Sequence, residues 1–126
     1  RVALAEIALE AGRGAEASRL ADEALRWEPE NWSARMIKAS AIAQLGQVSQ
    51  SRQAFADMLR ARPNDPEVQV RHGYVLLAEN KDSEAEAVFR KLYQPGQEDI
   101  RPVVGLAQLM AKRKQFGMAV DLLGKE

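Results

Sequence analysis

Apolar side chains recur at helical spacing along the whole chain, and no stretch shows the sustained apolar–polar alternation typical of a β-strand. Alanine and leucine, both strong helix formers, dominate the periodic stretches. Prolines lie only between these stretches or at their starts, where they end or begin helices. The pattern predicts an all-α protein with about eight helices, at residues 1–11, 15–27, 32–45, 48–61, 66–79, 82–93, 101–113 and 116–124.

Residues of one kind return every 34 positions. Turn positions share one phase, at Gly12, Gly46, Asn80 and Lys114. Small residues share two others, at Ala5, Ala39, Gly73 and Ala107, and at Ala17, Ser51, Ala85 and Ala119. Mostly large apolar residues share a fourth, at Ala21, Phe55, Phe89 and Leu123. A period of this length with two helices per unit indicates a row of helical hairpins.

These motifs resemble the tetratricopeptide repeat family over the whole length of the chain. The matching positions are the small residues Ala39, Gly73, Ala17 and Ala85, the turn residues Gly12 and Gly46, the aromatics Phe55 and Phe89, and the closing prolines Pro29 and Pro63. The resemblance implies a right-handed α-solenoid of antiparallel helix pairs, in one domain with repeats at about 1–31, 32–65, 66–99 and 100–126. Because the sequence opens and closes inside the pattern, without an initiator methionine, we expect a fragment of a longer protein.

Each motif position has a physical role. Small residues let paired helices approach closely, and Phe55 and Phe89 fill the space between hairpins. Gly12 and Gly46, and less readily Asn80, can take the left-handed conformation that closes a helix, and Asn31 and Asp65 stand where N-caps belong. Pro95 comes two residues early, which predicts a short helix before it and a long loop after it, with Pro102 opening the next helix.

Some positions depart from the family pattern. Arg35 and Lys38 occupy phases that are usually apolar, and His72 replaces a usual leucine. We interpret His72 as an interior or half-buried residue. Trp27 and Trp32 flank Pro29, and we expect them to pack between neighbouring repeats.

The balance of charges limits the classes of partner that the chain is expected to bind. Eighteen basic and 18 acidic residues give a formal net charge of zero over 126 residues, which argues against nucleic acid and against a polybasic membrane surface. No apolar run reaches the roughly 20 residues that span a bilayer, so we expect no membrane insertion. The richness in alanine, arginine and glutamate fits a bacterial source. The sequence does not distinguish a location in the cytoplasm from one in the periplasm or envelope.

Catalytic chemistry finds no support in the sequence. There is no cysteine, and His72 has no partner ligand at helical spacing, so no metal site, cofactor or catalytic residue is predicted. The serines lack a neighbouring base. The run Lys112-Arg113-Lys114 lies at a helix end, where cations are favourable. We therefore expect a protein that is not an enzyme.

The resemblance implies that first helices of the repeats line a concave groove for a partner peptide or helix. The predicted groove residues are Met36, Ser40, Val70, Arg71, Tyr74, Leu77, Arg101 and Gln108. Tyr74 is the best anchor, because an amphipathic aromatic often dominates an interface. Some members of the family hold the C-terminal carboxylate of a partner in this groove. We do not expect that here, because the groove positions lack the asparagines that such binding requires.

A second hypothesis is a structural spacer or self-association module. The terminal repeats are expected to expose Leu4 and Ile7 at one end and Phe116, Val120 and Leu123 at the other, surfaces that a neighbouring repeat normally covers. Successive repeats also alternate in formal charge, −3, +3, −3 and +3 (basic minus acidic residues: 4 − 7, 5 − 2, 4 − 7 and 5 − 2). An RNA-binding helical repeat is a third and weaker hypothesis, because the predicted groove is nearly uncharged.

Overall fold

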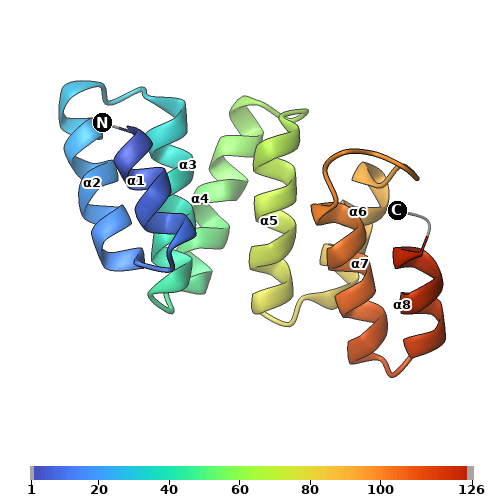
Figure 1. Cartoon of the computed structure of the whole chain (residues 1–126). Helices are drawn as coiled ribbons and strands as arrows, with labels where there is room; N and C mark the ends of the chain where they lie inside the picture. The colour runs from blue at the N-terminus through green and yellow to red at the C-terminus, as the bar shows by residue number, and fades with distance from the viewer. Residues whose placement is uncertain (1, 125–126) are drawn as a thin grey trace. The chain divides into compact units, whose positions relative to one another are not determined.

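The computed structural model describes residues 2–124, which form two compact units that divide between Pro63 and Asn64. The first unit holds α1 (Val2–Glu10), α2 (Gly14–Trp27), α3 (Trp32–Gln44) and α4 (Val48–Ala61). The second holds α5 (Pro66–Ala78), α6 (Asp82–Leu92), α7 (Arg101–Lys112) and α8 (Phe116–Leu123) (Figure 1). The described residues contain no strand, and the predicted all-α class is confirmed.

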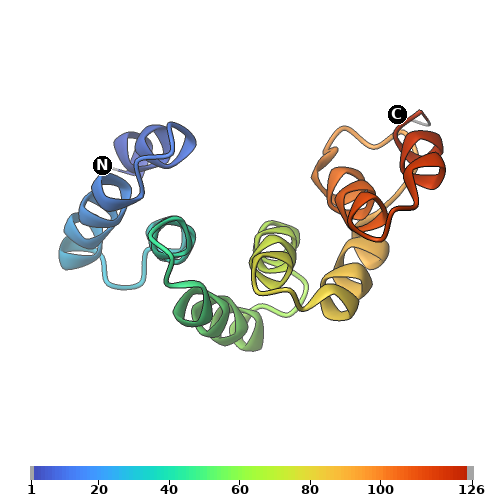
Figure 2. The same cartoon turned by 90° about the horizontal axis from the view of Figure 1, so that it is seen from below.

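Each unit contains two antiparallel hairpins that pack in the same way. In the first unit α2 packs against α3, and the first helices α1 and α3 lie side by side (Figure 2). In the second unit α6 packs against α7, and α5 lies beside α7. The later first helix of each unit, α3 or α7, therefore contacts both its own partner helix and the hairpin before it.

The first helix of every hairpin ends in the same hydrogen-bonded turn. The φ angles of Gly12, Gly46, Asn80 and Lys114 are +76°, +88°, +62° and +62°. The backbone amide of each of these residues donates a hydrogen bond to the carbonyl three residues earlier. The next amide donates to the carbonyl five residues earlier, as from Arg13 to Ala8 at 2.9 Å. These are the two bonds of a Schellman motif, which satisfies the last carbonyls of a helix.

Helix starts and the long loop also follow the sequence. The Asn31 side chain accepts from the Ala34 amide at 3.0 Å, and the Asp65 carboxylate accepts from the Glu67 and Val68 amides at 3.0 and 3.2 Å. The helix α6 has 11 residues, against 14 in α2 and in α4. The early Pro95 accounts for this, and Pro102 stands in the first turn of α7.

Phe89 joins the two hairpins of the second unit. Its side chain is fully buried, in a cluster with Val70, Leu76 and Leu106. A Cβ atom added to Gly73 on α5 would lie 2.8 Å from the Phe89 ring, and one added to Gly105 on α7 would lie 2.5 Å from it. The ring therefore occupies the space that these two glycines leave open.

The charged departures in the first unit have contacts of two kinds, between helices for Lys38 and within α3 for Arg35. The Lys38 ammonium donates to the Ser18 hydroxyl and the Asp22 carboxylate of α2, both at 2.8 Å. Arg35 and Arg62 lie over the Trp32 ring, at 5.4 and 3.9 Å from its centroid. His72 is half-buried. Trp27 is 69% exposed, so the expectation that it packs between repeats is wrong.

Replacing Lys114 with glycine should stabilise the second unit by about 0.5–1 kcal/mol, because glycine adopts a positive φ without the Cβ clash that lysine has. The matched Gly46→Ala variant should lose about 1 kcal/mol for the converse reason. Thermal unfolding followed by circular dichroism measures both. A destabilised Lys114→Gly variant would contradict this account of the turn.

Adding a methyl group at Gly105 should destabilise the fold by about 1–3 kcal/mol, because the Phe89 ring has no room to move away. Shrinking the ring in the double variant Gly105→Ala, Phe89→Leu should recover part of that loss. The two substitutions should therefore be non-additive in urea unfolding. Additive effects would show that the ring and Gly105 are not in contact.

Candidate partner-binding surface

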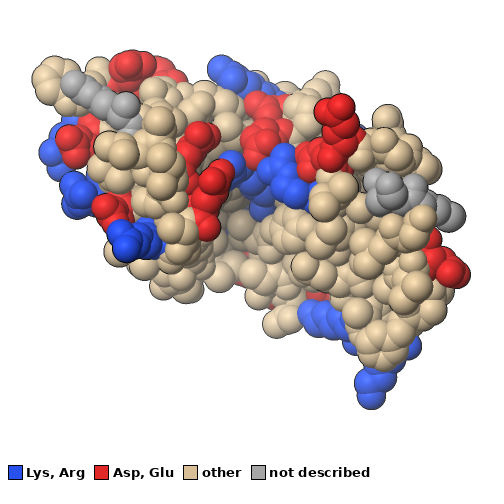
Figure 3. Space-filling model, viewed as in Figure 1, with Lys and Arg blue, Asp and Glu red and all other residues tan. Residues whose placement is uncertain are grey.

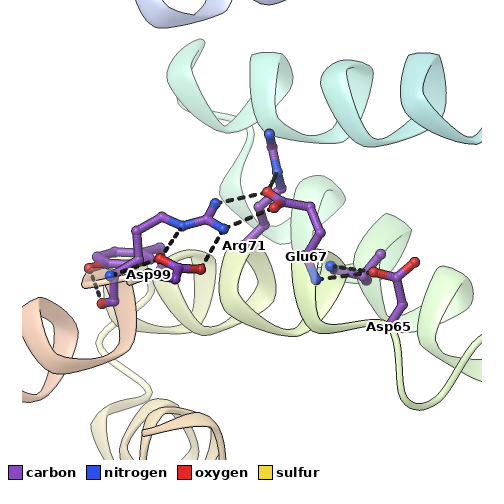
Figure 4. Close-up of polar contacts among 7 residues, drawn as sticks. Asp65, Glu67, Arg71 and Asp99 are labelled. Atoms are coloured by element: carbon purple, nitrogen blue, oxygen red, sulfur yellow. Dashed lines mark hydrogen bonds and ion pairs between the residues drawn. The ribbon is translucent and has the colours of Figure 1, made fainter. Parts of the chain in front are cut away.

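A polar network links the first helices of the second unit (Figure 4). Glu67 on α5 accepts a hydrogen bond from the Arg71 guanidinium, one turn further along the same helix, at 2.6 Å. Its two oxygens also accept from the Arg101 guanidinium of α7 at 2.8 and 2.9 Å. This two-pronged pairing matches the planar fork of arginine to the carboxylate and fixes the relative position of α5 and α7.

Asp99, in the loop before α7, completes the network. It accepts from the Arg101 backbone amide at 3.0 Å and from the Arg101 side chain at 2.9 and 2.8 Å. The Arg101 guanidinium thus lies between two carboxylates, which raise its pKa. Hydrogen bonding to Arg101 lowers the pKa of Asp99 and, helped by Arg71, lowers the pKa of Glu67 to about 2.

Tyr74 is held by contacts at both ends of its side chain. Its hydroxyl donates to the Arg101 backbone carbonyl at 2.7 Å, and its ring meets Phe89 edge-on with centroids 5.0 Å apart. Partial burial raises the pKa of the hydroxyl, which therefore stays protonated and able to donate at neutral pH. The side chain remains partly exposed, so it presents a rigid aromatic surface.

The remaining predicted residues differ in exposure. Leu77 is half-buried against the core of the second unit, and Gln108 is exposed on α7. Met36 and Ser40 are half-buried on α3 of the first unit. Val70 is only 2% exposed and packs in the cluster around Phe89, so its side chain is not available to a partner.

The structure brings the predicted residues Arg71, Tyr74 and Arg101 together. The carboxylates of Glu67 and Asp99 hold the two arginines in place. Sequence reasoning did not pair these acids with the arginines. Two signals were present: Glu67 precedes Arg71 by four residues, and Arg101 follows Glu67 by 34, which places both at one phase of neighbouring repeats.

Charge is unevenly distributed over this face. Acidic and basic side chains lie next to one another over α5 and the start of α7, whereas much of the surface over α7 and α8 is uncharged (Figure 3). Among residues 2–124, no group of three or more acidic or histidine side chains could hold a metal ion. In the same range, none of the helices has the length and apolarity to cross a bilayer.

Neutralising Glu67 in Glu67→Gln should lower stability near pH 7 by about 1–2 kcal/mol, a figure that allows for solvent screening of a partly exposed group. The folded-state pKa lies below the ordinary 4.5, so the carboxylate stabilises the fold above that value. The contribution is lost as pH falls from 4.5 toward 2, and the variant should approach the parent there.

Urea unfolding at pH 7 and pH 3 measures this difference. The control Glu23→Gln removes an exposed pair with Arg19 at 3.7 Å and should cost at most about 0.5 kcal/mol. An equal deficit for Glu67→Gln at both pH values would mean that the pair with Arg101 does not stabilise the fold.

Comparison with known proteins agrees with the repeat geometry. Two family models described as tetratricopeptide repeat match residues 1–70 and 44–100. No curated protein matches the sequence. A solved structure, "MamA RS-1 ArsTM double mutant", has the same fold, with a TM-score of 0.70 and 24% identity over 97% of this chain and 68% of that one. The family matches support a general role as a protein-interaction scaffold, and the chain belongs to the tetratricopeptide repeat family.

Proposed function

We propose that the chain binds a partner peptide or helix on the exposed side of its first helices and performs no catalytic step of its own. The observation that carries this proposal is Tyr74, which is partly exposed on α5 yet held by Arg101 and Phe89. An aromatic side chain that is already fixed loses little conformational entropy when a partner covers it. Such residues are typical anchors of protein interfaces.

Arg71 and Arg101 have a different role in this proposal. Their guanidinium groups are engaged by Glu67 and Asp99, so an acidic partner would have to displace an existing carboxylate. We infer that the two arginines shape the surface, and that binding energy comes from apolar contact with Tyr74 and Leu77. These two residues are three apart on α5 and so share one face of the helix.

Gln108 adds to the proposed surface of the second unit, and the first unit carries equivalent residues of its own. Gln108 is exposed on α7 and offers both a donor and an acceptor to a peptide backbone. On α3, Met36 and Ser40 occupy the positions equivalent to Val70 and Tyr74 one repeat later. Met36 is partly exposed, and its flexible thioether suits an apolar partner side chain. Val70 is left out because it is buried.

The neutral charge favours a protein partner over nucleic acid. Affinity for nucleic acid comes largely from cationic side chains that neutralise phosphates. Here the arginines on the proposed surface are already paired with carboxylates. A salt-dependent interaction with RNA would count against the proposal.

Photo-crosslinking can identify the partner. A benzophenone amino acid at position 74 should capture a specific protein in cells that make this chain. A matched probe at Ala87, which is exposed on the second helix α6, should not capture it. The captured protein then serves as the ligand in calorimetry.

In that assay Tyr74→Ala should weaken binding about tenfold or more, while Ala87→Ser should bind as the parent does. Met36→Ala reports separately on the first unit. Equal capture at positions 74 and 87, or unchanged affinity for Tyr74→Ala, would contradict the proposed surface.

A further inference from the structure

A shallow hollow lies between α2 and α4 of the first unit. These two helices pack against α3 but not against each other, which leaves one side of α3 open between them. Ala39 and Met58, which are 1% and 2% exposed, form the floor of the hollow, and the half-buried Leu25 and Ile42 also line it. The hollow therefore offers apolar surface to a partner.

The size of the hollow suits one large apolar side chain. Sites for cofactors and other small molecules usually have volumes of about 300–1,000 Å³ and enclose most of their ligand. This hollow measures about 230 Å³ and is open to solvent. It therefore fits a single anchoring side chain of a partner better than a whole small molecule.

Three charged side chains also line the hollow, Arg35 and Lys38 from α3 and Asp57 from α4. The Lys38 ammonium pairs with the Asp22 carboxylate at 2.8 Å, and the Asp57 carboxylate pairs with Arg60. Within residues 2–124, Arg35 pairs with no carboxylate, and its guanidinium lies over the ring of Trp32. Arg35 is therefore the cation at this hollow that an acidic partner can engage without displacing a carboxylate.

Trp32 brings a second arginine to the same place. The Arg62 guanidinium, at the end of α4, lies 3.9 Å from the centroid of the Trp32 ring, and that of Arg35 lies 5.4 Å from it. Arg62 also pairs with no carboxylate among the described residues. Stacking on an aromatic ring orients a guanidinium and leaves its N–H donors available to a carboxylate.

The second unit closes the equivalent junction with apolar side chains. Val103 and Leu106 on α7 are equivalent to Arg35 and Lys38, two periods of 34 later, and they are 0% and 1% exposed. In the first unit two charged side chains thus stand where the same fold elsewhere buries two apolar ones. Departures of this kind from the local rules of a fold are expected at functional sites.

The repeat that contains the hollow has a surplus of positive charge. Residues 32–65 carry five basic and two acidic side chains, a net charge of +3. Both acidic side chains are engaged, Asp57 by Arg60 and Asp65 by the first backbone amides of α5. The positive field attracts an acidic partner and repels a basic one.

We propose that the first unit binds a short acidic peptide segment at this hollow. One large apolar side chain of the segment enters between α2 and α4, and carboxylates beside it in the sequence pair with Arg35 and Arg62. The apolar contact supplies most of the affinity, and the charge pairs select acidic segments. This site is separate from the surface around Tyr74, so it stands or falls separately from the proposed function.

Fluorescence anisotropy with labelled synthetic peptides tests the ligand chemistry. The probe is Gly-Ser-Asp-Asp-Phe-Asp-Asp-Ser-Gly, and two controls replace its phenylalanine with alanine or its four aspartates with lysines. The probe should bind with a Kd below about 1 mM, and both controls should bind at least about tenfold more weakly. A probe that does not bind in this range, or an alanine control that binds equally well, would overturn the proposal.

Variants of the chain test the position of the site with the same probe. Arg35→Gln should weaken binding about tenfold, whereas Arg90→Gln, which removes an exposed arginine of α6, should not change it. Ala54→Leu places a larger side chain in the hollow, which Ala54 lines, and should abolish binding without lowering the temperature of thermal unfolding. Tyr74→Ala should bind the probe as the parent does. Unchanged affinity in folded Arg35→Gln or Ala54→Leu would overturn the proposed site.

Discussion

The turn that closes each first helix fixes where everything else in a unit lies. At Gly12, Gly46, Asn80 and Lys114 the backbone enters the left-handed region and returns two amides to the carbonyls of the preceding helix. Because the reversal occurs at the same phase of each repeat, the second helix always begins at the same point beside the first. A small residue at a crossing then leaves room for a large side chain, as Gly73 does for Phe89.

The same periodicity gives the network around Arg101 its geometry. Glu67 and Arg101 are 34 residues apart and therefore occupy one phase of neighbouring first helices. A charge pair at this spacing ties one hairpin to the next, as Lys38 and Asp22 do between α3 and α2. Lys38, which departs from the family pattern, thus serves as an interhelical contact in the first unit. In the second unit Phe89 fills the apolar side of the junction that Glu67 and Arg101 tie together.

The proposed partner surface is shaped by these structural contacts. Tyr74 depends on the Arg101 carbonyl, and Arg101 in turn depends on Glu67 and Asp99. Changes in the network would therefore alter the position of the aromatic side chain without removing it. This link between stability and recognition is expected where one helix both packs against its neighbours and faces outward.

Helix number, helix type and the shared turn phase could all be predicted from the sequence, because they depend on local periodicity, proline placement and N-cap residues such as Asn31 and Asp65. Even the shortened α6 follows from the early Pro95. The exposure of Leu4, Ile7, Phe116 and Val120 could also be inferred, since their phase is known.

Two features were decided only by the tertiary structure. Burial of Val70 and pairing of Arg71 and Arg101 with carboxylates depend on which side chains of neighbouring helices come within contact distance. Periodicity assigns a residue to a face of its own helix, but only packing determines what covers that face.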